Sequence, residues 1–170
     1  MTGRDLPKTF VALDFELANR SPRSVCELGA VAIADGKTVW EMQLLFSPEP
    51  PGVTFHRLHG HTEETLHGAP RFPTEWPLIQ PHLSRFSTWV AHNAAFERRV
   101  LRETCRYWRL VQPRVQWICT MNLAAQELGK RNRSLSKASA ALSIPLQHHC
   151  ALSDARAASL LLMKLATARR

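Results

Sequence analysis

Two carboxylates, Asp14 and Glu16, stand two residues apart at the end of an apolar, β-forming run that begins at Thr9. Side chains alternate across a β-strand, so both acids point to one face, about 6–7 Å apart along the chain, and Phe15 points to the other. Like charges on an otherwise buried strand are costly unless a cation lies between them. The pair therefore predicts a divalent-cation site, although a solvated acidic face at a strand end explains an isolated pair as well.

Two more carboxylates lie where the chain enters a helix. Glu97 ends the stretch VAHNAAFE, which is typical of a buried strand followed by a first helical turn, and Asp154 lies at the start of the last helix, five residues after His149. Proteins of the α/β class tend to place ligands at such strand-to-helix turns. Each residue alone has a simpler explanation, because acids stabilise helix N-termini, Ser153 or Asp154 can cap a helix, and a lone histidine is usually a surface residue.

Strand and helix signals follow one another in an order that would bring these residues together. The hydrophobic pattern and the turn signal Asp35-Gly36 predict a meander of three strands, and later buried strands are followed by helices. Short helices are expected at 62–66 and after Pro73, and a mobile basic segment at 129–134. The predicted strands are 9–16, 25–34, 38–46, 87–93 and 115–119, and the main predicted helices are 96–110, 121–128, 134–142 and 152–166.

The length and composition predict one compact α/β domain. A chain of 170 residues, 45% of them hydrophobic, can bury a core of its own, and we expect an N-terminal tail at 1–8 and a single domain at 9–168. No stretch approaches the length of a membrane span, and the first ten residues lack the apolar segment of a signal peptide, which predicts a cytoplasmic protein without membrane association. The four cysteines form no CxxC pair and are expected to be reduced thiols.

The charge balance favours a phosphate-rich partner. The chain carries 22 Lys and Arg against 14 Asp and Glu, a formal net charge of +8, although a basic surface can also serve solubility alone. One stripe of arginines follows Glu97 at helical spacing: Arg98, Arg102, Arg106 and Arg109. A second basic cluster lies in the sequence between Glu97 and Asp154: Lys130, Arg131, Arg133 and Lys137. The stripe is as typical of a solvated helix face as of a nucleic-acid contact, whereas the second cluster is better placed to guide phosphates.

The order of the acidic pieces identifies the chain better than any one of them. DxE at Asp14, HNAxF(D/E) ending at Glu97, and HxALxDA beginning at His149 follow one another at the spacing of one family. The chain resembles the DEDDh, or DnaQ-like, class of 3′–5′ exonucleases, which includes proofreading enzymes, and the resemblance covers nearly the whole chain. Supporting stretches are FVALDFELANR, CELGAVAIADGKTV, RLHGHTEETLHGAPRFPTEWPLI, WVAHNAAFERRVL and WICTMNLA.

The resemblance implies a ribonuclease-H-like α/β fold of three layers, with a mixed five-stranded sheet flanked by helices. It also implies two divalent cations, Mg²⁺ or Mn²⁺, because hard cations take oxygen ligands and two of them can clamp the attacking and leaving oxygens at phosphorus. The expected cation ligands are Asp14, Glu16, Glu97 and Asp154. His149, rather than its neighbour His148, is the expected general base, since an ordinary pKa of about 6.5 suits proton transfer near neutrality.

Two positions depart from the family pattern. The family almost always has aspartate where this chain has Glu97, and a shift of about 1 Å in a catalytic group can cost on the order of a hundredfold in rate. Retained activity is the favoured outcome, with an altered metal preference or a weakened enzyme as the alternatives. Leu17 stands where many relatives carry threonine, which bears on substrate fit. The expected substrate-binding residues are Phe15, Leu17, His92, Asn93 and Phe96, although the two phenylalanines are more typical of core residues than of base-stacking platforms.

The leading hypothesis is a metal-dependent 3′–5′ exonuclease that hydrolyses the terminal phosphodiesters of single-stranded DNA and releases nucleoside 5′-monophosphates. RNA trimming is the alternative within enzymes, and a non-catalytic nucleic-acid-binding or polymerase-docking module is the alternative outside them. A metal-dependent phosphatase is disfavoured, because the chain has neither a Gly-rich phosphate loop nor an evident nucleophile. A stand-alone repair or scavenging role is the default, work beside a polymerase or repair partner is the alternative, and the oligomeric state is open.

Overall fold

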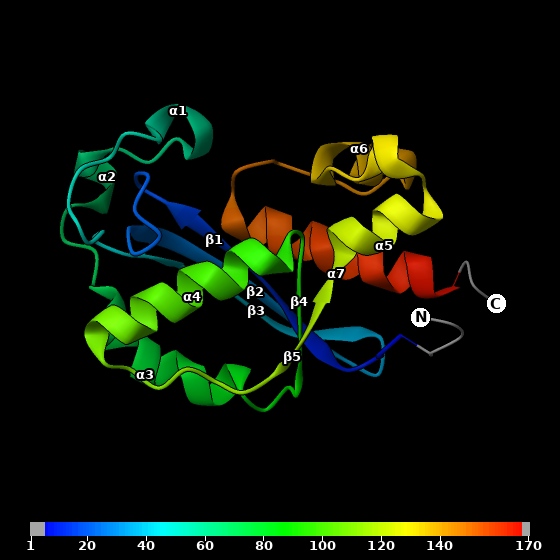
Figure 1. The fold of residues 1–170 in the computed structure, drawn as a ribbon, viewed down its shortest axis with the longest axis horizontal. Coiled ribbons are helices and arrows are strands. Elements are labelled where there is room, and N and C mark those ends of the chain that lie inside the picture. The colour runs from blue at the N-terminus through cyan, green and yellow to red at the C-terminus, as the bar shows by residue number, and fades with distance from the viewer. Residues whose placement is uncertain (1–5, 168–170) are drawn as a thin grey trace.

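The structure, a computed structural model, describes residues 6–167. Residues 1–5 and 168–170 lie outside the described residues, and with them most of the expected N-terminal tail and the last residue of the expected domain. Strands of the described chain form one five-stranded sheet in the order β3-β2-β1-β4-β5 (Figure 1). The strands are β1 Phe10–Leu17, β2 Val25–Ala34, β3 Lys37–Leu45, β4 Thr88–Ala91 and β5 Gln116–Cys119. The first three strands pair antiparallel, and β4 and β5 continue the sheet in parallel with β1.

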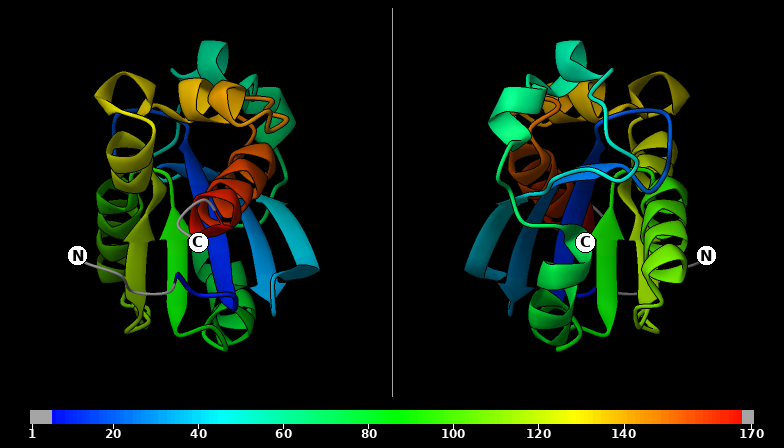
Figure 2. Two further views of the ribbon diagram at one scale, coloured as in Figure 1. Left: turned by 90° about the vertical axis from the view of Figure 1, so that its right-hand side faces the viewer. Right: turned by 90° about the vertical axis from the view of Figure 1, so that its left-hand side faces the viewer.

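Helices cover both faces of this sheet (Figure 2). Those before β5 are α1 His56–His59, α2 Glu63–Leu66, α3 Phe72–Leu83 and α4 Ala94–Trp108. Those after β5 are α5 Thr120–Glu127, the 3₁₀ helix η1 Lys130–Asn132, α6 Leu135–Ala141 and α7 Ala151–Thr167. Side chains of α3 and α4, such as Trp76 and Val100, pack with Val11 and Phe15 of β1 on one face. Side chains of α7, such as Leu162, pack with Phe10 on the other.

The predicted fold class is therefore confirmed: a mixed five-stranded sheet lies between two helical layers, as in ribonuclease-H-like exonucleases. Alternation along β1 produces the two cores, since its odd-numbered residues face α3 and α4 and its even-numbered residues face α7. No helix of the described chain is long and apolar enough to cross a membrane. The four cysteines are free thiols, as predicted.

Several predicted boundaries were wrong. The helix expected after Pro73 begins before it, at Phe72, and runs for 12 residues despite two internal prolines, because burial of Phe72 and Trp76 outweighs the cost of the prolines. Helix α7 begins at Ala151, so neither Ser153 nor Asp154 is its N-cap. The single turn α1 was not predicted, since four residues with no buried side chain show no periodicity. The segment 129–134, expected to be mobile, contains the 3₁₀ helix η1.

Candidate active site

Asp14 and Glu16 lie on the face of β1 that α7 covers, as the alternation predicts. Phe15, between them, is 3% exposed and belongs to the opposite core. Past Ala12, β1 no longer pairs with β4, so the end of β1 stands at the carboxyl edge of the sheet, where parallel strands diverge. This edge is where α/β proteins usually bind ligands.

Asp154 is brought to the same place by a glycine in the neighbouring strand. Gly29 of β2 is the cross-strand partner of Asp14, and a Cβ added to Gly29 would lie 2.1 Å from the carbonyl carbon of Ala151. The first turn of α7 therefore rests directly on the sheet backbone, a contact that only glycine permits. Sequence reasoning passed over Gly29, although a glycine inside a strongly apolar strand is itself a signal of such a close approach.

The three acids form a compact cluster: Asp14, Glu16 and Asp154 each offer one carboxylate oxygen, and these oxygens all lie within 4.8 Å of one another. Burial, followed by the charges of Glu97, Glu16 and others, raises the pKa of Asp14 well above its ordinary value. Burial, followed by Asp154 and Glu27, raises the pKa of Glu16 to about 8. Burial also raises the pKa of Asp154. The cluster thus resists ionisation unless a positive charge joins it.

An unpartnered oxygen shows where such a charge fits. Asp154 is 3% exposed, and its Oδ1 is buried without a hydrogen-bond partner among the described residues. A buried carboxylate oxygen normally accepts at least one hydrogen bond, so this atom requires an explanation. Clustered carboxylate oxygens with one coordination position unused are the donors that hard divalent cations prefer. The residues present therefore fit a divalent metal ion.

Glu97 approaches from the opposite side of the sheet and is engaged differently. It is 2% exposed, and its Oε2 accepts a hydrogen bond of 3.1 Å from the backbone N–H of Phe15, just past the end of the β1–β4 pairing. Burial raises its pKa well above the ordinary value, and the Phe15 hydrogen bond opposes that shift. Glu97 is outside the set of three whose oxygens lie within 4.8 Å, so its longer side chain spans to the β1 backbone instead.

Two adjacent histidines face these acids. His148 Nδ1 lies 2.8 Å from Asp154 Oδ2, which also accepts the backbone N–H of His149 at 3.2 Å. The ring of His149 stacks on that of His148 with centroids 4.0 Å apart, and its Nδ1 lies 3.8 Å from Glu16 Oε1. Burial and the neighbouring His148 lower the pKa of His149, so its ring is neutral near pH 7 and can accept a proton. Nothing in the sequence predicts the contact between His148 and Asp154, apart from the position of His148 next to His149.

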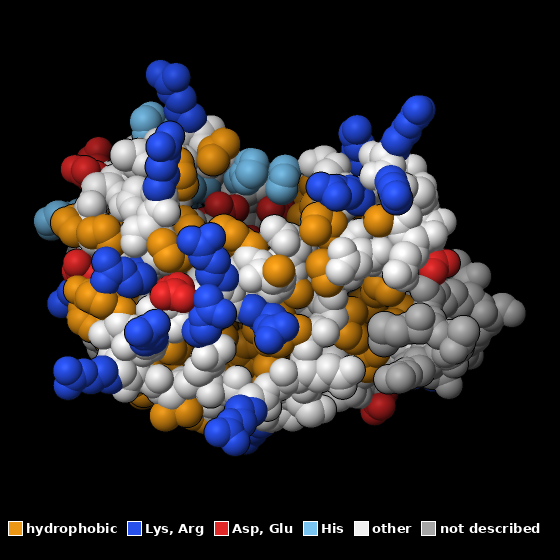
Figure 3. All heavy atoms as spheres, in the orientation of Figure 1, with side chains coloured by type: hydrophobic (Ala, Val, Ile, Leu, Met, Phe, Trp, Pro, Cys, Tyr) orange, Lys and Arg blue, Asp and Glu red, His pale blue; other side chains and the backbone are white. Residues whose placement is uncertain are grey.

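A cleft of about 530 Å³ opens over the acids. Figure 3 shows carboxylates at the floor of a hollow, histidines beside them, and Lys and Arg side chains on both shoulders. Four of the expected substrate-binding residues line this cleft: Phe15, Leu17, Asn93 and Phe96. Phe96 is 38% exposed, so the expectation that it is a core residue was wrong, whereas Phe15 is a core residue that borders the floor.

His92 is not among the residues that line the cleft. Its Nδ1 lies 3.0 Å from Thr120 Oγ1, between β4 and α5, and burial lowers its pKa to about 4. A neutral, inward-facing ring cannot act as a cation for phosphate, and we assign His92 to the packing of this corner. Sequence reasoning also missed cleft residues from the loop after β1 and from the start of α1, because nothing local marks them: Asn19, Arg20, Phe55 and Leu58.

The two basic groups are exposed. Arg98, Arg102, Arg106 and Arg109 all face solvent along α4 and the residue after it, opposite the buried Val100 and Leu101. Lys130, Arg131, Arg133 and Lys137 are likewise exposed on η1, the residue after it and α6. Figure 1 places α6 across from α1 at the edge of the sheet where β1 ends, and Figure 3, in the same orientation, shows Lys and Arg side chains on that side of the hollow.

Comparisons with known proteins agree with this geometry. The exonuclease family model RNase_T matches residues 11–162. A PolC-type DNA polymerase III of Thermotoga petrophila is 34% identical over 152 residues, which cover 87% of this chain and 11% of that protein. Exodeoxyribonuclease 10 of Escherichia coli is 34% identical over 104 residues, which cover 59% of this chain and 40% of that protein. The chain thus spans two fifths or less of the length of these curated relatives.

A solved structure shares both the fold and part of the sequence. Exonuclease X in complex with 5′ overhanging duplex DNA superimposes with a TM-score of 0.74 and 26% sequence identity, over 94% of this chain and 92% of that chain. The residues that the family model matches, 11–162, include all four carboxylates of the site.

Proposed function

The chain belongs to the RNase_T exonuclease family, within the DEDDh class of 3′–5′ exonucleases, and from this premise we propose that it shortens single-stranded DNA from the 3′ end. Each turnover would break the terminal phosphodiester, releasing one nucleoside 5′-monophosphate and leaving a new 3′-hydroxyl. One observation carries the proposal: a carboxylate oxygen of Asp154, near the other end of the chain, meets those of Asp14 and Glu16 within 4.8 Å on the floor of a cleft.

The preference for DNA is supported by the relatives that resemble the chain in sequence. One is named exodeoxyribonuclease 10, another is a DNA polymerase III, and exonuclease X was solved with DNA. The net charge of +8 suits either nucleic acid. RNA trimming therefore stays as the second candidate.

We assign two divalent cations, Mg²⁺ or Mn²⁺, to Asp14, Glu16 and Asp154, with Glu97 as the fourth carboxylate. When bound, the cations would offset the charge of the scissile phosphate and stabilise the charge that develops on its oxygens. The basic cluster at Lys130, Arg131, Arg133 and Lys137 would attract the strand as a whole.

His149 would be the general base. Its ring is neutral near pH 7 because its pKa is lowered, and one ring nitrogen already faces the acids at 3.8 Å from Glu16. It would take the proton from the water that attacks phosphorus, while the bond to the 3′ oxygen of the preceding nucleotide breaks. His148, which is tied to Asp154, would hold that carboxylate in place.

The apolar side chains of the cleft would contact the terminal nucleotide. Phe96 and Leu58 are exposed, at 38% and 54%, although both are large and apolar, which suits stacking against an unpaired base. Leu17 and Asn93 border the same space. Work beside a polymerase is the setting that the PolC-type relative suggests for this domain.

The test is release of mononucleotides from matched single-stranded DNA and RNA oligomers, in Mg²⁺ and separately in Mn²⁺. The natural protein should release 5′-monophosphates from DNA faster than from RNA, and Asp14→Ala should release none. Glu97→Asp, run beside them, measures the effect of the longer side chain. Binding of oligomers without release in either metal would instead identify a nucleic-acid-binding module.

A further inference from the structure

A fifth carboxylate, Glu27, lies beside the acidic cluster, on the same face of the sheet as Glu16. It is fully buried on β2 and is the cross-strand partner of Glu16. Its Oε2 lies 2.8 Å from His61 Nε2, and its Oε1 accepts a hydrogen bond of 2.6 Å from Gln43 Nε2. A buried carboxylate is costly unless it is paired and hydrogen-bonded, and here both oxygens have partners. Glu27 is thus held away from the cleft, and the proposed chemistry does not use it.

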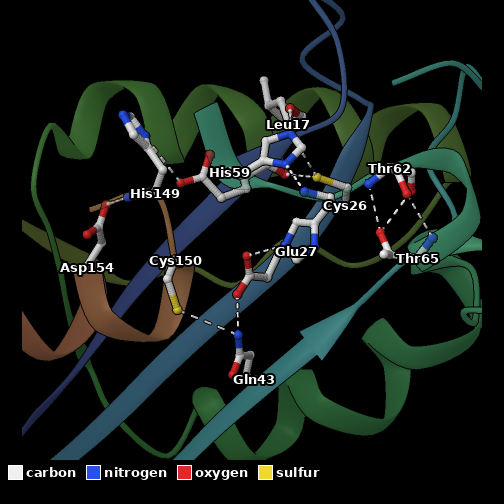
Figure 4. A network of polar contacts seen from close by, with 12 residues as sticks. Leu17, Cys26, Glu27, Gln43, His59, Thr62, Thr65, His149, Cys150 and Asp154 are labelled. Carbon is white, nitrogen blue, oxygen red and sulfur yellow. Dashed lines mark hydrogen bonds and ion pairs between the residues drawn. The ribbon is translucent and has the colours of Figure 1, made fainter. Parts of the chain in front are cut away.

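The partner His61 connects Glu27 to the rim of the cleft. The backbone N–H of His61 donates to His59 Nδ1 at 3.1 Å, so His59 carries its ring proton on Nε2 when neutral. That nitrogen lies 3.2 Å from the carbonyl oxygen of Leu17, to which it donates (Figure 4). The two imidazole rings also stack, with centroids 5.0 Å apart. A continuous series of contacts therefore runs from the buried Glu27 to the residue that follows Glu16.

The segment that these contacts hold is one wall of the cleft. Helix α1 has a single turn, no side-chain N-cap and no buried residue, so it has little stability of its own. It nevertheless presents Leu58 to the cleft, next to Phe55. Apart from the His59 and His61 contacts, the backbone N–H groups of Thr54 and Phe55 anchor it by donating to the carbonyl of Ala18.

We propose that Glu27 is a positioning residue: through His61 and His59 it fixes the α1 wall against β1, so that Leu58 and Leu17 form a preorganised seat for the terminal nucleotide. The proposal rests on the function assigned above. It predicts that breaking the Glu27–His61 contact weakens substrate binding and leaves the rate of the bound complex nearly unchanged, because the acids and His149 stay in place.

Steady-state kinetics on a single-stranded DNA oligomer test this inference. His61→Ala should raise KM about tenfold while kcat changes by less than about twofold, as expected for loss of one hydrogen bond to a charged group. His61→Gln, whose amide can still donate to Glu27, should recover most of that loss. His67→Ala is the matched control, because His67 is exposed and borders a different depression, lined also by Glu63 and Pro51.

A double-variant cycle separates positioning from general destabilisation. Glu27→Gln keeps the volume of the side chain but loses one acceptor, so it should raise KM by less than His61→Ala. The double variant should raise KM no more than His61→Ala alone, because both changes break one contact. Fluorescence anisotropy with a labelled oligomer should show the same order of Kd values without turnover, which keeps the test independent of the activity assay.

The results that would overturn the inference are distinct from a failure of the proposed function. An active natural protein whose KM and Kd are unaffected by His61→Ala excludes the positioning role. A fall in kcat at constant KM, or additive effects in the double variant, excludes it as well. A natural protein that binds the oligomer but releases no mononucleotide contradicts the exonuclease proposal instead, and the Kd series then decides the role of Glu27 alone.

Discussion

Asp154 on α7 and Glu97 on α4 both reach the site from the first turn of a helix, yet the structure uses them differently. Asp154 joins Asp14 and Glu16 within 4.8 Å and keeps its Oδ1 without a partner. Glu97 stands outside that set and accepts a hydrogen bond from the Phe15 backbone. A carboxylate in the first turn of a helix can thus face a cation site, or it can accept a hydrogen bond that holds a strand end. The local sequence does not distinguish these two roles.

The difference arises from how closely each helix approaches the sheet. Gly29 lets the first turn of α7 lie against the backbone of β2, so the short side chain of Asp154 suffices. Glu97 comes from the helical layer on the other side and reaches past the strand end to β1. The extra methylene of Glu97 lets its carboxylate reach the backbone N–H of Phe15 from that layer.

Alanine substitutions of Asp154 and Glu97 should show the largest difference between the two carboxylates. Asp154→Ala should lower kcat on single-stranded DNA by about 10³-fold or more, because a direct cation ligand is lost. Glu97→Ala should lower it by about 10- to 100-fold, because its loss changes the position of β1 more than the cation site. Rates measured at saturating Mg²⁺ check both, and equal losses would show that the two acids have the same role.

His149 and His148 should also differ in their effect on the rate. His149→Ala should lower kcat by about 10²- to 10³-fold through loss of the general base, and His148→Ala by less. The pKa of His149 is lowered from its ordinary value of 6.5, so kcat of the natural protein should be constant near pH 7 and fall only as the pH drops below about 6.5. A pH–rate profile of the three proteins measures this, and a larger loss with His148→Ala would reassign the base.

Gly29→Ala tests whether the close approach of α7 to β2 positions Asp154. An added Cβ would meet the Ala151 backbone, so α7 must shift and carry Asp154 away from Asp14, with a loss of about a hundredfold in kcat and a lower melting temperature. Gly36→Ala is the control: that glycine has φ +76° and nothing within 4 Å of an added Cβ, so stability should fall by about 1 kcal/mol without loss of activity. Normal activity in Gly29→Ala would mean that the close approach does not position Asp154.

The smallest expected effect concerns stability without metal. The pKa of Glu16 rises from 4.5 to about 8 on folding, so between these values the folded chain binds more protons than the unfolded chain. This contribution is fully present below pH 4.5 and is lost as the pH rises toward 8. The melting temperature of the metal-free protein should therefore fall by a few degrees or more across that window, and Mg²⁺ should restore it. Asp154→Asn should flatten the dependence, since Asp154 is the largest charge that raises the pKa of Glu16.

Much of the fold was predictable because its signals are local and strong. The alternation in β1 placed Asp14 and Glu16 on one face, and the order of the acidic pieces indicated the family that RNase_T represents. The apolar runs at β2, β4 and α4 gave their elements to within a few residues. The Thr62 side chain caps α2 as the predicted helix at 62–66 requires.

The rest of the site depended on contacts that no local pattern encodes. The tie from Glu27 to His61 joins residues 34 apart, and the contact of His148 with Asp154 depends on the path of the loop before α7. His92, although it lies between two active-site elements, turns toward Thr120 rather than the cleft. A residue can thus lie next to site residues in the sequence while its side chain points away from the cleft, because its neighbours in space set the direction of a loop side chain.

Calorimetric binding of Mn²⁺ tests the central claim most directly, since the account places the cations on Asp14, Glu16 and Asp154. The natural protein should bind Mn²⁺, Asp154→Asn should bind it at least about tenfold more weakly, and Glu97→Gln should lose less. Unchanged Mn²⁺ affinity in Asp154→Asn would contradict the account, because the acidic cluster would then not be the cation site.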